Sequence, residues 1–113
     1  MKVTLSGKEF TLRCDMRALA NAKREHNVDI SNLTESYKDD EGEIQQRENF
    51  DAFATLLFYF AKSGAKHAKT DFDYDRDDFL GLIGLEEMPT VMTAALALLG
   101  GGGESQKKAK ASR

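Results

Sequence analysis

The chain has 113 residues, a length that suits one domain with one core. Its formal net charge of -3 argues against a protein that coats nucleic acid non-specifically. The single cysteine, Cys14, excludes an intrachain disulfide and a cysteine-rich zinc site, and it favours a cytoplasmic chain. No stretch has the roughly 20 apolar residues of a membrane helix, and no N-terminal signal pattern is present.

Charge is distributed unevenly along the chain. Residues 1–26 contain six basic and three acidic side chains, whereas residues 35–51 contain two basic and seven acidic ones. This pattern is typical of solvated faces, and it also fits a surface that meets a basic or mixed-charge protein.

The first predicted element is a β-hairpin over residues 1–14. Apolar and polar residues alternate in two short runs, and Gly7 lies between them, where a tight turn requires positive φ. Asp15 follows as an N-cap, which predicts a helix over residues 16–26 that stops at Asn27. The apolar stripe expected on this helix consists of Met16, Leu19 and Ala20.

The next segment predicts little regular structure. A short apolar patch after the first helix predicts a brief helical turn that starts at Asp29 or Ser31. Residues 37–43, YKDDEGE, are charged, include a glycine and have no periodicity, which predicts a loop.

The strongest helical pattern covers residues 43–63, and Gly64 is expected to end it. The second half of this helix is apolar around most of its circumference, so it must be buried on several sides. We therefore predict that it is the central helix and that Phe53, Leu57 and Phe60 belong to the core. The full expected stripe is Phe50, Phe53, Ala54, Leu57, Phe60 and Ala61.

Two shorter helices complete the prediction. Asp75 or Asp77 is expected to cap a helix that runs to about Ile83 and stops at Gly84. Pro89 fits the first turn of a last helix. The predicted fold class is α+β: a hairpin over residues 1–14, a helical part of about four helices over 15–99, and a glycine-rich spacer with a basic, flexible tail over 100–113.

The residues that could support catalysis or metal binding form no recognisable site. Four alternating aspartates resemble a calcium loop, but Arg76 occupies the position that needs glycine and Leu82 the position that needs glutamate. His26 and His67 have no second ligand at zinc spacing. The four aspartates of the apparent calcium loop are Asp71, Asp73, Asp75 and Asp77. The sequence therefore predicts neither an enzyme nor a cofactor.

Apolar surface is the positive signal. Residues 88–103 contain no charged side chain, and apolar residues cover every face of the last helix. A small domain cannot easily bury all sides of a terminal helix, so part of this surface is expected to contact another chain. The predicted partner-binding residues are Met88, Val91, Met92, Leu96 and Leu99.

Three segments in this order carry a family resemblance. The opening VTLSGKEFTLRCDMRALANAKRE gives a hairpin and a helix that begins near DMRAL; FDAFATLLFYFAK gives an aromatic-rich central helix; DYDRDDFLGLIG gives an aspartate-rich start to a short helix. Over residues 1–99 the chain resembles the small tail assembly chaperones of long-tailed bacteriophages and prophages.

The resemblance implies a non-enzymatic protein that binds the tape measure protein and keeps it soluble while the tail tube assembles. The tail tube protein and a second copy of the chain are further partners that it allows, whereas it implies no membrane and no specific nucleic acid. It also implies a location in the host bacterial cytoplasm and absence from the mature virion.

Two other classes of protein stay open. One is a small structural adaptor or head-to-tail joining component of the phage particle; the other is a nucleic-acid-binding regulator that uses the basic tail.

The tail also permits a programmed ribosomal frameshift, because codons for Gln106, Lys107 and Lys108 can form a slippery heptamer. The resemblance implies that such a shift would make a longer fusion product.

Overall fold

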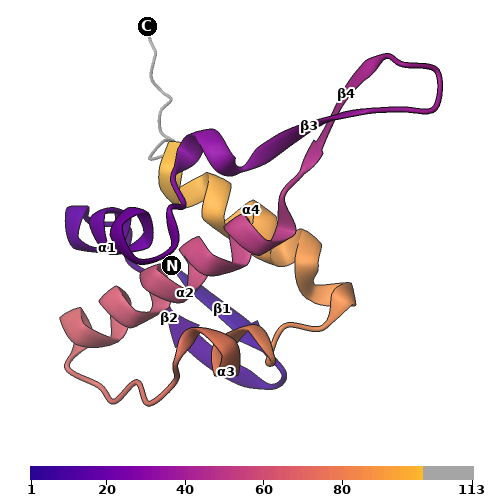
Figure 1. The fold of residues 1–113 in the computed structure, drawn as a ribbon. Helices are drawn as coiled ribbons and strands as arrows, with labels where there is room; N and C mark the ends of the chain where they lie inside the picture. Colours follow the sequence, from indigo (N-terminus) through magenta and orange to yellow (C-terminus); the bar gives the residue numbers. More distant parts are fainter. Residues whose placement is uncertain (101–113) are drawn as a thin grey trace, which may run out of the picture.

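The computed structural model describes residues 1–100 and has an α+β fold, which confirms the predicted class (Figure 1). An N-terminal hairpin packs on a long central helix, a second hairpin projects from the body, and three further helices complete the fold. The spacer and tail expected after Gly100 lie outside the described residues. In chain order the elements are β1 (Lys2–Leu5), β2 (Lys8–Thr11), α1 (Met16–His26), η1 (Ile30–Asn32), β3 (Thr34–Lys38), β4 (Ile44–Glu48), α2 (Phe50–Ala68), α3 (Arg76–Leu80), η2 (Leu85–Glu87) and α4 (Met88–Gly100).

The predicted N-terminal hairpin is confirmed. β1 and β2 pair antiparallel around a two-residue turn in which Ser6 and Gly7 both have positive φ, 49° and 78°. Such turns match the right-handed twist of the strands that they join. The backbone N–H of Arg13 donates to the carbonyl of Phe60 in α2, with an N···O distance of 3.0 Å, so the hairpin is fixed to the central helix. Its buried side chains are Val3, Leu5, Phe10 and Leu12.

The hairpin turn also contacts the segment that leads into α4. The Ser6 backbone N–H donates to Oε2 of Glu87 at 3.1 Å, and the Ser6 hydroxyl donates to the carbonyl of Leu82 at 2.6 Å. These bonds join residues that are 81 and 76 positions apart in the sequence. Because β1 also lies against α4, the two ends of the described chain share one surface.

The first helix has the predicted bounds. Asp15 accepts a hydrogen bond from the Ala18 backbone N–H at 2.9 Å, and Asn27 ends the helix with a left-handed φ of 55°. The buried face differs from the expected stripe, because Ala18 and Ala22 are the buried residues. Two alanines one turn apart leave room for the backbone of α1 to approach α2, and larger side chains are displaced to the rim. Of the expected stripe, Leu19 is half-buried, whereas Met16 and Ala20 are exposed.

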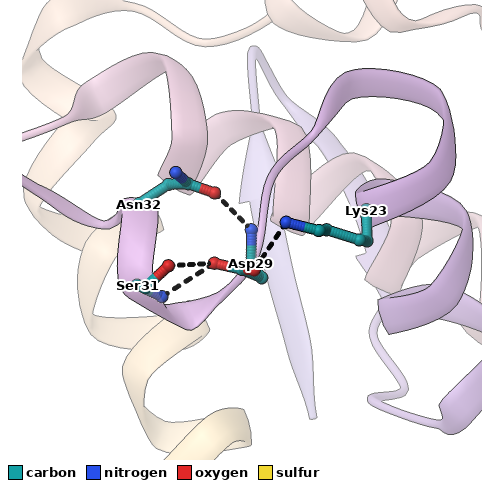
Figure 2. Close-up of polar contacts among 4 residues, drawn as sticks. All are labelled: Lys23, Asp29, Ser31 and Asn32. Carbon is teal, nitrogen blue, oxygen red and sulfur yellow. Dashed lines mark hydrogen bonds and ion pairs between the residues drawn. The ribbon is translucent and has the colours of Figure 1, made fainter.

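The brief helical turn predicted after α1 is η1, and Asp29 caps it (Figure 2). The Asp29 carboxylate accepts bonds from the Ser31 backbone N–H at 2.9 Å and the Ser31 hydroxyl at 2.5 Å. Asn32 returns the contact by accepting the Asp29 N–H at 2.7 Å, which is the reciprocal arrangement of a capping box. Lys23 of α1 lies 3.0 Å from the same carboxylate and ties η1 to the preceding helix.

A second hairpin stands where the sequence predicted a loop and the start of a helix. We call residues 34–48, which comprise β3, β4 and their turn, the arm. The arm projects from the body in Figure 1, and each of its residues is exposed or half-buried. The helix start predicted at residue 43 is therefore wrong. Of the predicted loop, residues 39–43 form the turn of the hairpin, whereas Tyr37 and Lys38 belong to β3. The reason is that both faces of the arm are polar, so its sequence lacks the alternation that marks a strand with one buried face.

The arm closes at both ends through local hydrogen bonds. At the tip, the Asp39 carboxylate accepts the backbone N–H groups of Glu41 and Glu43, both at 2.9 Å. At the base, the Asn49 N–H donates to the Leu33 carbonyl at 2.8 Å. Leu33 is buried, so the core begins where the arm ends.

Central helix α2 starts at Phe50, behind an Asn49 cap, and runs to Ala68. Phe53, Leu57 and Phe60 are buried, which confirms the predicted core stripe at these positions. Phe50 is 50% exposed, so the expected stripe is wrong at its first residue. Its place in the first turn, beside the base of the arm, leaves it with little of the core to pack on.

Gly64 does not end the helix as predicted. It lies inside α2, and a Cβ atom built on it would be 2.0 Å from the carbonyl oxygen of Thr11. The glycine is therefore present because the backbone of β2 needs its space. The helix ends four residues later, at Ala68, and the next residue, Lys69, caps it with a left-handed φ of 61°.

The last helices agree with the sequence in part. Asp75, one of the two expected caps, accepts the Asp78 N–H at 2.7 Å and begins α3. Helix α3 is shorter than predicted and ends at Leu80, and Gly84 precedes η2 instead of stopping a helix. The last helix, α4, runs from Met88 to Gly100, with Pro89 in its first turn as predicted.

One hydrophobic cluster joins these elements, and its aromatic part lies between β2, α2 and α3. The ring centroids of Phe10 and Phe79 are 5.1 Å apart, and those of Phe58 and Phe79 are 5.8 Å apart. The first pair is edge-to-face and the second is tilted, and edge-to-face pairs add to the energy of apolar burial. Phe72 and Tyr74, in the connector before α3, also pack edge-on against Phe10.

Candidate partner-binding surface

Helix α4 packs one side on α2 and presents the other to solvent. The packed side includes Met88 and Val91, which are buried in the core, together with Ala94 and Ala95. Met88 and Val91 were predicted to bind a partner, and the structure places them inside the molecule instead. The uncharged sequence could not show which side of the helix meets α2, because every side is apolar.

The other three predicted residues retain exposed surface. Leu96 is 53% exposed, and Met92 and Leu99 are half-buried at the edge of the core. Leu96 therefore presents the largest apolar side chain on the outer side of α4. Its exposed neighbours are Pro89, Thr90, Thr93 and Ala97.

A hollow of about 380 Å³ adjoins this outer side, between α4 and the start of β1. Lys2 carries the one charged side chain that lines it, and the other lining residues are small or apolar. Sequence reasoning missed this hollow, because its two walls come from opposite ends of the chain. We call Leu96 and the hollow together the α4 surface; the hollow is lined by Met1, Lys2, Val3, Pro89, Thr90, Thr93, Ala94 and Ala97.

The arm is a second exposed element, and it has a different chemical character. Its residues include six acidic and two basic side chains. One face is ordered by Arg47, which pairs with Glu35 at 3.1 Å and lies 4.8 Å from the ring centroid of Tyr37. Ile44, on the opposite face, is 65% exposed. The arm thus offers a polar, mainly acidic surface with open strand edges among the described residues.

Cys14 packs against the core, and the buried Tyr59 lies beside His26. Burial raises the pKa of the Cys14 thiol, and the negative charge of Asp15 raises it further. The thiol is therefore protonated near neutral pH. The Tyr59 hydroxyl donates to Glu25; desolvation and this carboxylate raise the pKa of Tyr59 far above its usual range. His26 packs near the ring of Tyr59, with the ring centroids 5.9 Å apart.

The alternating aspartates do not converge. Asp75 caps α3, whereas Asp71, Asp73 and Asp77 are exposed. Within residues 1–100, no group of three or more histidine, cysteine, aspartate or glutamate side chains is arranged to hold a metal ion.

The same part of the chain has no helix that is both long enough and apolar enough to cross a membrane. Comparison with protein-family models, with curated proteins and with solved structures gives no significant match.

Proposed function

We propose that the protein is a non-enzymatic tail assembly chaperone of a long-tailed bacteriophage or prophage. In this proposal it binds the tape measure protein through the α4 surface in the cytoplasm of the host bacterium, keeps that protein soluble while the tail tube assembles, and is absent from the mature virion. The tail tube protein and a second copy of the chain are further candidate partners.

The observation that carries the proposal is the exposed apolar side of α4. Leu96 is exposed on the helix whose residues also line a hollow with small, mainly uncharged walls, so an apolar side chain of a partner helix can enter the hollow while Leu96 packs against the rest of that helix. Such contacts remove apolar surface from water on both chains. A protein that binds exposed apolar segments in this way limits their aggregation by mass action and needs no catalytic group.

On α4, the residues that stabilise the fold and the residue proposed to bind the partner are different. Val91 and Ala95 are fully buried against the core, whereas Leu96 adds little to it. Substitutions at Leu96 should therefore change partner binding without unfolding the protein.

The proposal is tested with the substitution Leu96→Asp. A charge on the exposed side of α4 should weaken binding of the co-expressed tape measure protein at least tenfold, which corresponds to about 1.4 kcal/mol. The free energy of unfolding should fall by no more than about 2 kcal/mol, because aspartate is a weaker helix former than leucine and its charge lies near the C-terminus of α4. Pull-down and titration measure binding, and urea unfolding measures stability.

The matched control is Leu85→Asp, because Leu85 is 87% exposed and lies outside α4. It should bind the tape measure protein as the parent does. A folded Leu96→Asp variant that binds normally would show that the α4 surface is not the contact. Detection of the protein in purified, washed virions would instead favour a structural adaptor or head-to-tail joining component.

A further inference from the structure

We propose that the protein has a second binding site, a basic groove between α1 and α2 that takes a short acidic peptide segment with two carboxylates about one helical turn apart. The basic groove consists of Arg13, Arg17, Lys62, Lys66 and His67. This site is separate from the α4 surface, because the two share no lining residue.

The basic groove is formed by two adjoining hollows of about 230 Å³ and 330 Å³. Arg17, Ser63 and Lys66 line both of them, so the hollows form one continuous depression. Its walls are the exposed side of α1 and the last turns of α2. The buried alanines of α1 bring these helices close together and place their basic side chains along the same depression.

Three cations of the groove lack an acidic partner at ion-pair distance among the described residues. Arg17, Lys62 and Lys66 have no carboxylate within 4.0 Å among residues 1–100. Lys62 contacts an aromatic ring instead, with its Nζ 5.9 Å from the centroid of Phe58. Positive charge therefore gathers in the depression with no direct ion pair to these three side chains, which favours an anionic ligand.

Asp15 is the one acid that lines the groove, and its carboxylate is already occupied. It accepts bonds from the Ser63 hydroxyl at 2.5 Å and the Ala18 N–H at 2.9 Å, and it pairs with Arg13 at 3.3 Å. These contacts compensate the negative charge of Asp15 and hold its carboxylate in place beside Ser63 and Arg13. They leave the three unpaired cations for a ligand.

The spacing of the cations indicates the spacing of the ligand. Lys62 and Lys66 are four residues apart on α2, so their Cβ atoms are about 5–6 Å apart. Acidic side chains four residues apart on a helix have the same spacing, and alternate residues of a strand are about 6.7 Å apart. A peptide with two such carboxylates can meet both lysines at once, and Arg17 can reach the ligand from the opposite wall.

The surroundings favour a short acidic peptide over a nucleic acid. Beyond Lys62 the depression continues into a hollow of about 480 Å³, where three carboxylates outnumber the one further guanidinium, that of Arg76; the acids are Glu25, Asp75 and Asp77. A strand of uniform negative charge would be repelled there, whereas a short acidic segment can end before it. The ring of Tyr59, which lies under the groove, is 2% exposed and offers no platform for base stacking.

The test uses the full chain and a blocked, alanine-based peptide that carries two glutamates four residues apart. Titration should shift the backbone amide signals of Asn21, Ser63 and Lys66 in NMR spectra, and binding should weaken as salt is added. The double substitution Lys62→Gln/Lys66→Gln should weaken peptide binding at least tenfold. Both lysines are exposed, so the variant should fold as the parent does.

The control variant Lys8→Gln/Lys38→Gln loses the same net charge from exposed positions outside the groove, and it should bind within twofold of the parent. Three results would overturn the proposal: equal binding of a peptide with glutamines in place of the glutamates, amide shifts outside the groove, or tighter binding of a single-stranded oligonucleotide of equal charge at the same amides. Since the readout is peptide binding, it is independent of the tape measure experiment.

Discussion

Gly64 lets the central helix contact the N-terminal hairpin because it has no side chain. The backbone of β2 occupies the space that a side chain would fill, since a Cβ atom would lie 2.0 Å from the Thr11 carbonyl oxygen. The same approach lets the Arg13 N–H reach the carbonyl of Phe60. One missing methyl group thus permits the contact between the helix and the hairpin.

We expect Gly64→Ala to lower the free energy of unfolding by about 3 kcal/mol, because the hairpin or the helix must shift to admit the methyl group. Urea unfolding measures the loss. Gly81→Ala is the control: its Cβ would meet its nearest neighbour, the Asp78 carbonyl oxygen, at an ordinary 3.4 Å. Equal stability of the two variants would contradict the close contact.

Asp15 joins three parts of the molecule through one carboxylate. Burial alone would raise its pKa, but hydrogen bonds from Ser63, Ala18 and Arg13 outweigh that effect and lower the pKa. A carboxyl group whose pKa is lower in the folded state stabilises the fold above its unfolded pKa of about 3.9. That stabilisation is lost as the pH falls through the lower, folded pKa.

The substitution Asp15→Asn keeps a side chain that can cap α1 but removes the charge. At pH 7 we expect a loss of about 1 kcal/mol in the free energy of unfolding. The difference from the parent should shrink as the pH falls below about 4, where the parent begins to lose the same charge. Urea unfolding at several pH values measures it, with Asp73→Asn as a control at an exposed position. A difference that is constant with pH would contradict this role.

At the scale of elements, α2 carries most of the core. Phe53 and Phe60 are buried among residues of the hairpin, α1 and α4, whereas Phe50 is half exposed one turn earlier. Phenylalanine therefore occurs on the same helix in a buried and in a half-exposed environment. The difference in stability lost when each ring is removed measures the contribution of burial.

Phe53→Ala should cost about 3–5 kcal/mol of unfolding free energy, because it removes a buried ring and leaves a cavity. Phe50→Ala should cost less than ~1 kcal/mol. Thermal or urea unfolding of the two variants gives the comparison. Similar losses would mean that α2 is rotated relative to the structure described above.

Elements with local signals were predictable from the sequence. The bounds of α1 follow from Asp15 and Asn27, which act on the backbone next to them, and the hairpin turn follows from Gly7. The arm was missed because neither face is buried, so its composition resembles a loop. Gly64 was misread because glycine usually interrupts a helix, and the reason for this one lies in a distant strand.

The candidate sites were predictable only in outline. The uncharged run from Met88 located an apolar surface, but the side that faces α2 depends on packing that the sequence does not show. The basic groove left no sequence signal, because Arg17 and Lys66 are far apart in the chain and meet only after α1 packs on α2. Sites built from one element are visible in a pattern, whereas sites built between elements need the fold.

At the scale of the whole molecule, three surfaces of different character surround one core. The α4 surface is apolar, the basic groove is positive and the arm is mainly acidic. The arm contributes little to the core, since its residues are exposed or half-buried. Binding by the arm and stability of the core can therefore change independently.

We expect the protein to fold without the arm. The Leu33 carbonyl accepts the Asn49 N–H, so these residues are placed like the two ends of a β-turn. Replacement of residues 34–48 by Asn-Gly should shift the melting temperature by less than ~4 °C, about 1 kcal/mol or less. Calorimetry measures the shift. A drop of more than ~10 °C, or loss of a cooperative transition, would show that the arm supports the core.

The bonds from Ser6 to Glu87 and Leu82 have a consequence for the order of events during synthesis. The hairpin leaves the ribosome before α4, and its turn must wait for residues made about 80 positions later. Contacts between such distant segments slow folding, because a long loop must close before they form. Until α4 emerges, the nascent chain exposes apolar surface of β1 and α2 that the finished fold covers.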